Sequence, residues 1–139
     1  MNYRLLFAAV VACLACAWTS PALADPCDSA LPAQGTTFSG VVRYVGDGDG
    51  LCIGPGGRSD LWIEIRLADF HAPELQEPGG ADAKRLLERS VMGKQLVCRA
   101  GRRSYDRVVA ACTANGRALG TLLRDAGGRE GGRGRPPKP

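Results

Sequence analysis

Residues 61–68 read LWIEIRLA, and their side chains alternate strictly in character. One face of this segment carries Leu61, Ile63, Ile65 and Leu67. The opposite face carries Trp62, Glu64 and Arg66. Because successive side chains of a β-strand point to opposite faces, this period of two predicts a strand that is buried on one side.

Further strands are predicted on both sides of this segment, at 38–45, 51–53, 95–99 and 107–113. Residues 46–50 read GDGDG and predict a tight turn between the first two of them. Helical spacing of apolar residues predicts one helix over 81–92 and a second, shorter helix over 117–126. Short strands with interposed helices favour a mainly β fold, a small closed or partly closed barrel of the oligonucleotide/oligosaccharide-binding (OB) type.

The length of 139 residues and an apolar fraction of 45% predict one packed domain with terminal extensions. Residues 1–24 predict a signal peptide, with a basic start, an apolar run over 5–17 and a small-residue cleavage pattern over 22–24. An uncleaved anchor and a lipoprotein cleavage box at 10–13 are the alternatives. After cleavage we expect a monomeric periplasmic or secreted protein with no membrane attachment.

The mature chain is predicted to divide into three parts. Residues 25–36 form an irregular lead-in, residues 37–126 form the domain, and the basic Gly/Arg/Pro-rich residues 127–139 form a disordered tail. Residues 25–126 carry 13 basic and 13 acidic side chains. Any attraction of the domain to an anion must therefore come from a few placed arginines rather than from its net charge.

Four of the six cysteines remain after removal of the predicted signal peptide, an even number suited to an oxidising compartment. Cys98 and Cys112 fall in two predicted strands whose connection is short enough for a hairpin, so we expect a disulfide between them. Cys27 is then expected to pair with Cys52 and hold the N-terminal segment. The single histidine and the lack of a C-x-x-C spacing in the mature part argue against a His-rich site or a zinc cluster.

Three segments carry polar residues that a plain barrel does not need: the GDGDG turn at 46–50, RLADFHAPE at 66–74, and SYDR at 104–107. Each has an ordinary interpretation, as a hairpin turn, a solvated loop and a surface charge. The first segment lacks the 12-residue loop of an EF-hand.

Taken in order, VGDGDG, IRLADFHAPE, QEPGGADAKRLLE and SYDRVVA resemble the staphylococcal nuclease (thermonuclease) family, over about residues 38–126. The resemblance implies a five-stranded OB-fold barrel with two helices. It also implies hydrolysis of phosphodiester bonds in DNA or RNA, as an endonuclease, with a divalent metal ion that is usually Ca2+.

The resemblance also implies a role for each matching residue. The implied metal ligands are Asp49, the residue at position 71 and the backbone carbonyl of Ala72. The implied catalytic residues are Glu74 as general base and Arg66 and Arg107, which hold the phosphate, while Tyr105 contacts the substrate. These residue types suit the chemistry, because the reaction needs an activated water and fixed donors on the phosphate oxygens.

Three departures from the family pattern concern this site. Gly50 stands where the family has Thr, Asp106 stands where it has Gly, and His71 stands where a second metal-binding Asp is expected. Imidazole is a poor ligand for Ca2+, so His71 favours Mn2+ or Zn2+ instead, with Asp69 as a further candidate ligand.

Two other interpretations of the chain stay open. His71 is as well explained as a neutral hydrogen-bonding residue with no metal. The chain as a whole could be a catalytically weak barrel that binds nucleic acid or another anion, or a structural module of the cell envelope.

Overall fold

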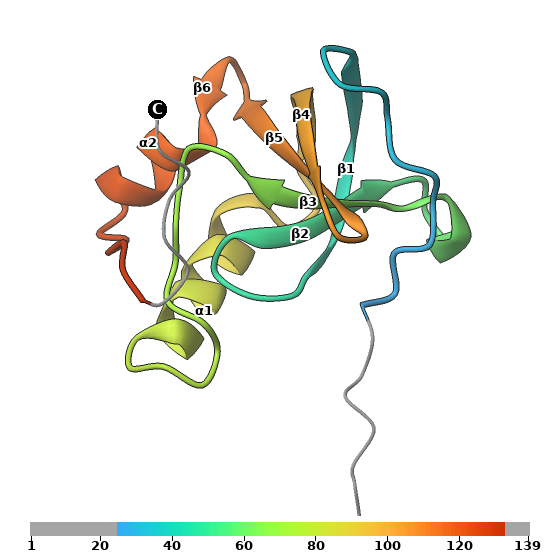
Figure 1. The fold of residues 1–139 in the computed structure, drawn as a ribbon. Coiled ribbons are helices and arrows are strands. Elements are labelled where there is room, and N and C mark those ends of the chain that lie inside the picture. Colours follow the sequence, from blue (N-terminus) through green and yellow to red (C-terminus); the bar gives the residue numbers. More distant parts are fainter. Residues whose placement is uncertain (1–24, 133–139) are drawn as a thin grey trace, which may run out of the picture.

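The structure is a computed structural model that describes residues 25–132 (Figure 1). The predicted signal peptide and residues 133–139 of the predicted tail lie outside the described residues. Within residues 25–132, no helix is long and apolar enough to cross a membrane.

The strands form one mainly antiparallel sheet of six. They are β1 (Thr37–Val45), β2 (Gly50–Gly54), β3 (Ile63–Leu67), β4 (Gln95–Ser104), β5 (Arg107–Ala114) and β6 (Arg117–Ala118). The order in the sheet is β3-β2-β1-β4-β5-β6, and β3 also pairs with β5 in parallel. Pairings therefore run from β1 through β2, β3, β5 and β4 back to β1.

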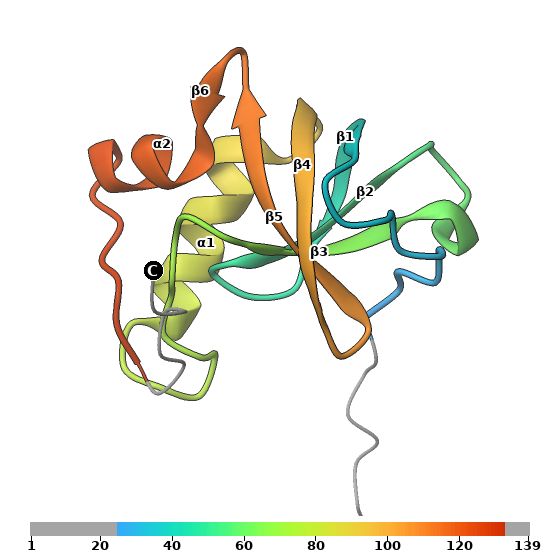
Figure 2. The same ribbon diagram turned by 45° about the horizontal axis from the view of Figure 1, so that its top comes forward.

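The core lies between these strands and the two helices. It contains Val42, Leu51, Ile53, Ile65, Leu67, Leu96 and Val108 from the strands, all nearly inaccessible to solvent. Helix α1 (Gly80–Val91) adds Leu87 and Val91, and helix α2 (Leu119–Asp125) adds Leu119 and Leu123. Both helices lie on the same side of the strands (Figures 1 and 2).

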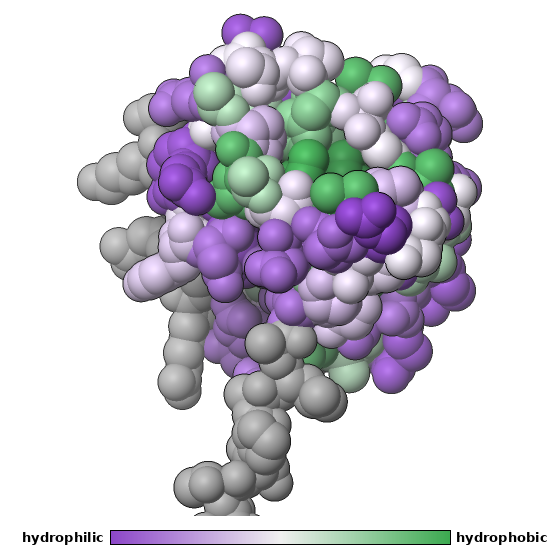
Figure 3. All heavy atoms as spheres, turned by 90° about the vertical axis from the view of Figure 1, so that its right-hand side faces the viewer, coloured by the Kyte–Doolittle hydropathy of each residue, from purple (hydrophilic) through white to green (hydrophobic). Residues whose placement is uncertain are grey.

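The mainly β fold with two helices is thus confirmed, with differences at the element ends. β4 runs to Ser104 instead of 99, and the two-residue β6 precedes α2. Leu61, predicted to be buried, is 45% exposed, because residues 59–61 form the 3-10 helix η1 (Ser59–Leu61), with Trp62 donating its N–H to the Ser59 carbonyl. On the face in Figure 3, apolar patches lie among hydrophilic side chains.

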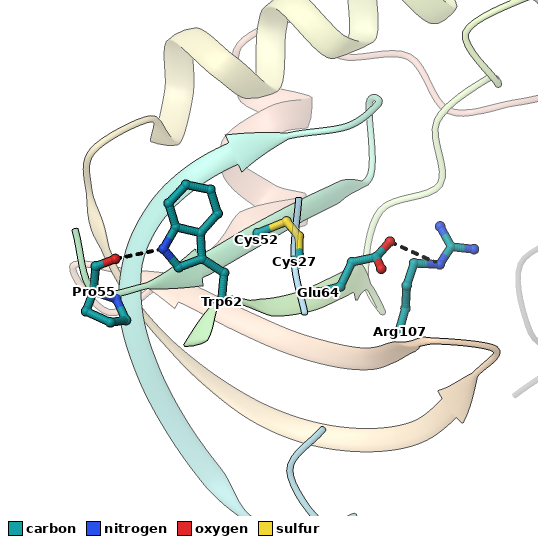
Figure 4. The surroundings of a disulfide bond; sticks show 6 residues. All are labelled: Cys27, Cys52, Pro55, Trp62, Glu64 and Arg107. Atoms are coloured by element: carbon teal, nitrogen blue, oxygen red, sulfur yellow. Dashed lines mark hydrogen bonds and ion pairs between the residues drawn. A yellow bond between two sulfur atoms is a disulfide. The ribbon is translucent and has the colours of Figure 1, made fainter. Parts of the chain in front are cut away.

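Both predicted disulfides are confirmed. Cys98 on β4 lies opposite Cys112 on β5, with their Cα atoms 4.1 Å apart. Cys27 bonds to Cys52 on β2 and so fastens the N-terminal segment to the sheet (Figure 4).

Residues 127–132, which were expected to belong to a disordered tail, form hydrogen bonds with α2 and with the loop after β3. Gly127 and Gly128 donate backbone hydrogen bonds to the carbonyls of Arg124 and Leu123, which continue the end of α2. Gly131 then donates its N–H to the carbonyl of His71 at 3.1 Å. The segment 127–132 therefore folds back from α2 to the loop that follows β3.

Candidate functional site

The turn between β1 and β2 places Asp49 in the interior of the protein. The Asp47 carboxylate accepts the Asp49 N–H at 3.0 Å, which closes the turn locally. A Cβ on Gly48 would lie 2.5 Å from the Cβ atoms of both Ala72 and Ala83, so only glycine lets the turn pack this closely. Asp49 is only 3% exposed as a result.

The glycine at position 50, where the resemblance led us to expect threonine, is explained by local packing. A Cβ at this position would lie 2.8 Å from Oδ1 of Asp47, the same oxygen that closes the turn. Glycine here is therefore part of the packing of this turn.

Asp49 meets Arg66, from β3, and His71 and Ala72, from the loop after β3. Its Oδ2 accepts the Ala72 N–H at 2.9 Å. The same oxygen lies 3.6 Å from Nη2 of Arg66 and 3.5 Å from Nδ1 of His71. The Arg66 Nη2 in turn lies 2.9 Å from the His71 Nδ1. The three side chains thus form one compact network.

Burial sets the protonation of this network. It raises the pKa of Asp49 to about 6, with the Asp47 charge adding to the increase and the Ala72 N–H and Arg66 opposing it. Burial and the Arg66 charge lower the pKa of His71. His71 is therefore neutral at pH 7, and its contact with Asp49 is not an ion pair.

The tautomer of His71 follows from its neighbours. A guanidinium only donates, so Nδ1 of His71 accepts from Arg66 and the proton lies on Nε2. Nε2 is buried and has no hydrogen-bond partner within residues 25–132.

The remaining predicted site residues, Glu74, Tyr105 and Arg107, form no hydrogen bond or ion pair with Asp49, Arg66 or His71 in the described part of the chain, although the charge of Glu74 acts on His71. Glu74 is exposed in the loop after β3, where its backbone N–H bonds to the Glu77 carboxylate. Tyr105 is 95% exposed at the tip between β4 and β5, with a positive φ of 58°. Arg107, at the start of β5, has its Nε 4.0 Å from Oε1 of Glu64.

Asp69 contacts helix α2 rather than the Asp49 network, where it was expected. Its Oδ2 accepts the backbone N–H of Gly120 at 2.9 Å, one of the first N–H groups of α2, which have no partner within that helix. Its carbonyl accepts a hydrogen bond from Arg124 at 2.5 Å. Asp69 thus holds α2 against the loop and does not join Asp49.

The donor set around Asp49 does not fit Ca2+. Calcium takes six to eight oxygen ligands, whereas this network offers a single carboxylate, and one of its oxygens already accepts from Ala72. The imidazole nitrogen nearest to it accepts from Arg66, so a softer ion would have to displace that guanidinium. In the described part of the chain, no three His, Cys, Asp or Glu side chains gather as a metal site.

Glu64 is a notable residue that the sequence did not single out. It is only 8% exposed, although the alternation of β3 assigns it to the outer face. Burial, a hydrogen bond to Asp25 and the charges of Asp106 and Asp25 raise its pKa to about 7, while Arg107 opposes the increase. Figure 4 shows it pointing toward Arg107, near the Cys27–Cys52 bond.

A hollow of about 420 Å³ lies beside the Asp49 network. We call it the arginine hollow; its polar lining includes Arg66, His71, Arg102, Thr121, Arg124 and Glu130. Three guanidinium groups from separate elements thus surround one space. No protein-family model matches the chain, and no curated protein matches it either.

Proposed function

We propose that this chain is a phosphodiester hydrolase of the nuclease type that acts on DNA or RNA. The observation that carries the proposal is the meeting of Asp49, Arg66 and His71, which come from the β1–β2 turn, from β3 and from the loop after it. These are segments that the ordered resemblance to the staphylococcal nuclease family assigns to one site.

We also propose that β1 to β5 form an OB-type barrel. In its support, the pairings return from β4 to β1, and β3–β5 is the one parallel pair among the described strands. In the parallel pairing of these two strands, Arg66 on β3 lies opposite Val109 on β5, two residues after Arg107.

The proposed chemistry uses the residues of this chain. The planar guanidinium of Arg66, with the side chain 20% exposed, offers two parallel N–H donors to phosphate oxygens. Arg107, similarly half-buried, would hold the same phosphate from β5. The exposed carboxylate of Glu74 would take a proton from the attacking water as the new P–O bond forms and the bond to the leaving oxygen breaks.

The two disulfides support a periplasmic or extracellular location for this hydrolase. Such bonds persist where the surroundings are oxidising.

A second candidate function is nucleic-acid or other anion binding without efficient cleavage. It is favoured by the position of the Arg66 guanidinium, a cation that lies 2.9 Å from the His71 Nδ1 and 3.6 Å from the Asp49 Oδ2. Such a protein would keep its arginines for phosphate contact and lack turnover.

A cleavage assay tests the proposal. The oxidised protein is incubated with single-stranded DNA or RNA in Ca2+, Mn2+, Zn2+ or a chelator, beside the variant Arg66→Ala. We expect cleavage in at least one condition and a loss of about 100-fold or more in the variant. Arg58→Ala is the matched control, because Arg58 pairs with Asp60 on the exposed η1 segment and should change nothing. Binding without cleavage in every condition would support the second candidate instead.

A further inference from the structure

The carboxylate of Glu130 bridges two donors that lie far apart in the sequence. Its Oε1 accepts the backbone N–H of His71 at 2.9 Å, and its Oε2 accepts from Nε of Arg124 at 3.1 Å. The next residue, Gly131, bonds to the carbonyl of His71. The Glu130 carboxylate thus binds the backbone N–H of His71 and the guanidinium of Arg124 at the same time.

These two donors are of the kind that hold phosphate groups. A backbone N–H and an arginine fork bind carboxylate and phosphate oxygens through the same charge-assisted hydrogen bonds. They come from the loop after β3 and from α2, so the sheet and a helix fix their separation. We call this pair of donors, the His71 N–H and the Arg124 guanidinium, the cradle. Neither donor belongs to the segment that carries Glu130.

The lining of the arginine hollow holds more basic than acidic side chains. The arginine hollow also contains Arg66 and Arg102, and its negative groups are Asp69 and Glu130. One oxygen of Asp69 accepts from Gly120. Without the Glu130 carboxylate, the lining would hold three arginines and a single negative side chain, with Asp49 outside the lining and 3.6 Å from Arg66.

The Glu130 contact is accessible to solvent. The side chains of Arg124 and Glu130 are 45% and 40% exposed. The segment 127–132 contains four glycines, and Gly127, Gly131 and Gly132 have positive φ. Its hold on the cradle rests on a few hydrogen bonds rather than on buried apolar side chains, so an anion in solution can compete for the same donors.

We propose that the His71 N–H and the Arg124 guanidinium form a phosphate-binding site within the arginine hollow, and that Glu130 occupies it as an internal competitor. Phosphate binding at this site does not require hydrolysis. The proposal therefore adds Arg124 and Glu130, which the family resemblance does not assign, and a role for the backbone N–H of His71.

Inorganic phosphate titrated into the full chain tests the site directly. In 1H–15N spectra, the His71 amide and the Arg124 Nε–H signals should shift together and saturate with phosphate. Glu130→Gln removes the competing charge, so phosphate should bind about fivefold or more tightly. Asp125→Asn is the matched control, because it removes one exposed carboxylate from the neighbouring Arg117–Asp125 pair and should leave the affinity unchanged.

A single-stranded oligonucleotide in a second titration distinguishes the source of the phosphate. Displacement of inorganic phosphate from the two signals by the oligonucleotide assigns the site to nucleic acid, and failure to displace it assigns the site to free phosphate. Unshifted His71 and Arg124 signals in the wild-type chain, or equal or weaker phosphate binding by Glu130→Gln, would overturn the proposal. A chain without nuclease activity that still gains phosphate affinity in Glu130→Gln would overturn only the proposed function.

Discussion

Replacing Glu64 by Gln is expected to remove a large part of the pH dependence of stability. Glu64 is buried beside β5, and the groups around it are Asp25 from the N-terminal segment, Tyr44 from β1, and Asp106 and Arg107. Glutamine keeps nearly the same shape and cannot ionise. The substitution therefore mimics the protonated acid at every pH.

The magnitude follows from the shift in pKa. The pKa of Glu64 rises from an ordinary 4.5 to about 7, which corresponds to roughly 3 kcal/mol at 1.36 kcal/mol per unit. Because the folded chain binds this proton more tightly than the unfolded chain, the contribution is fully present below pH 4.5. It is lost as the pH rises through 7. Wild type should therefore lose stability over this range, and Glu64→Gln should lose much less.

Denaturant unfolding of the oxidised protein at about pH 5, 6, 7 and 8 measures this effect. The variant should exceed the free energy of unfolding of the wild type by less than about 1 kcal/mol near pH 5 and by up to roughly 3 kcal/mol near pH 8. Asp49 keeps its own dependence in the variant, because its pKa is also raised, from 3.8 to about 6. Glu88→Gln, a half-exposed position on α1, is the control and should follow the wild-type curve.

Two results would refute this reasoning. One is a wild-type stability that rises between about pH 5 and pH 8. The other is a Glu64→Gln variant that is less stable than the wild type near pH 8, which would mean that the ionised carboxylate stabilises Arg107 by more than its burial costs.

Two further substitutions test which contacts stabilise the folded domain. Replacing both Cys98 and Cys112 by Ala should cost about 2–4 kcal/mol in the free energy of unfolding, and an unchanged melting temperature under oxidising conditions would contradict the stapling role of this bond. Asp69→Ala should cost about 1 kcal/mol, because the Gly120 N–H at the start of α2 loses its acceptor; a cost no greater than that of Asp125→Ala in thermal unfolding would contradict it.

The local patterns predicted most of the fold. Strict alternation marked β3, and the two strand-like runs around Cys98 and Cys112 indicated their hairpin and their disulfide. The end of β4 was missed because residues 101–104 are Gly, Arg, Arg and Ser, which show no alternation of apolar side chains, although Ala100 before them is still in the core. Leu61 was misplaced because alternation continues through it while the backbone has already turned into η1.

The candidate site was harder to predict, because its geometry depends on contacts distant in the sequence. Asp69 was expected beside Asp49, but it meets Gly120, 51 residues away. Glu130 was assigned to a disordered tail, yet it bonds to the backbone of His71, 59 residues away. No local pattern of charge or hydropathy encodes such partners.

The most direct test of the proposed hydrolase is its turnover of a single-stranded oligonucleotide at saturating substrate, compared with that of Glu74→Gln. The account predicts many turnovers by the wild type, a fall of about 100-fold or more in the variant, and an unchanged affinity for the oligonucleotide. Equal turnover in the two proteins, or tight binding with no turnover in either, would contradict it.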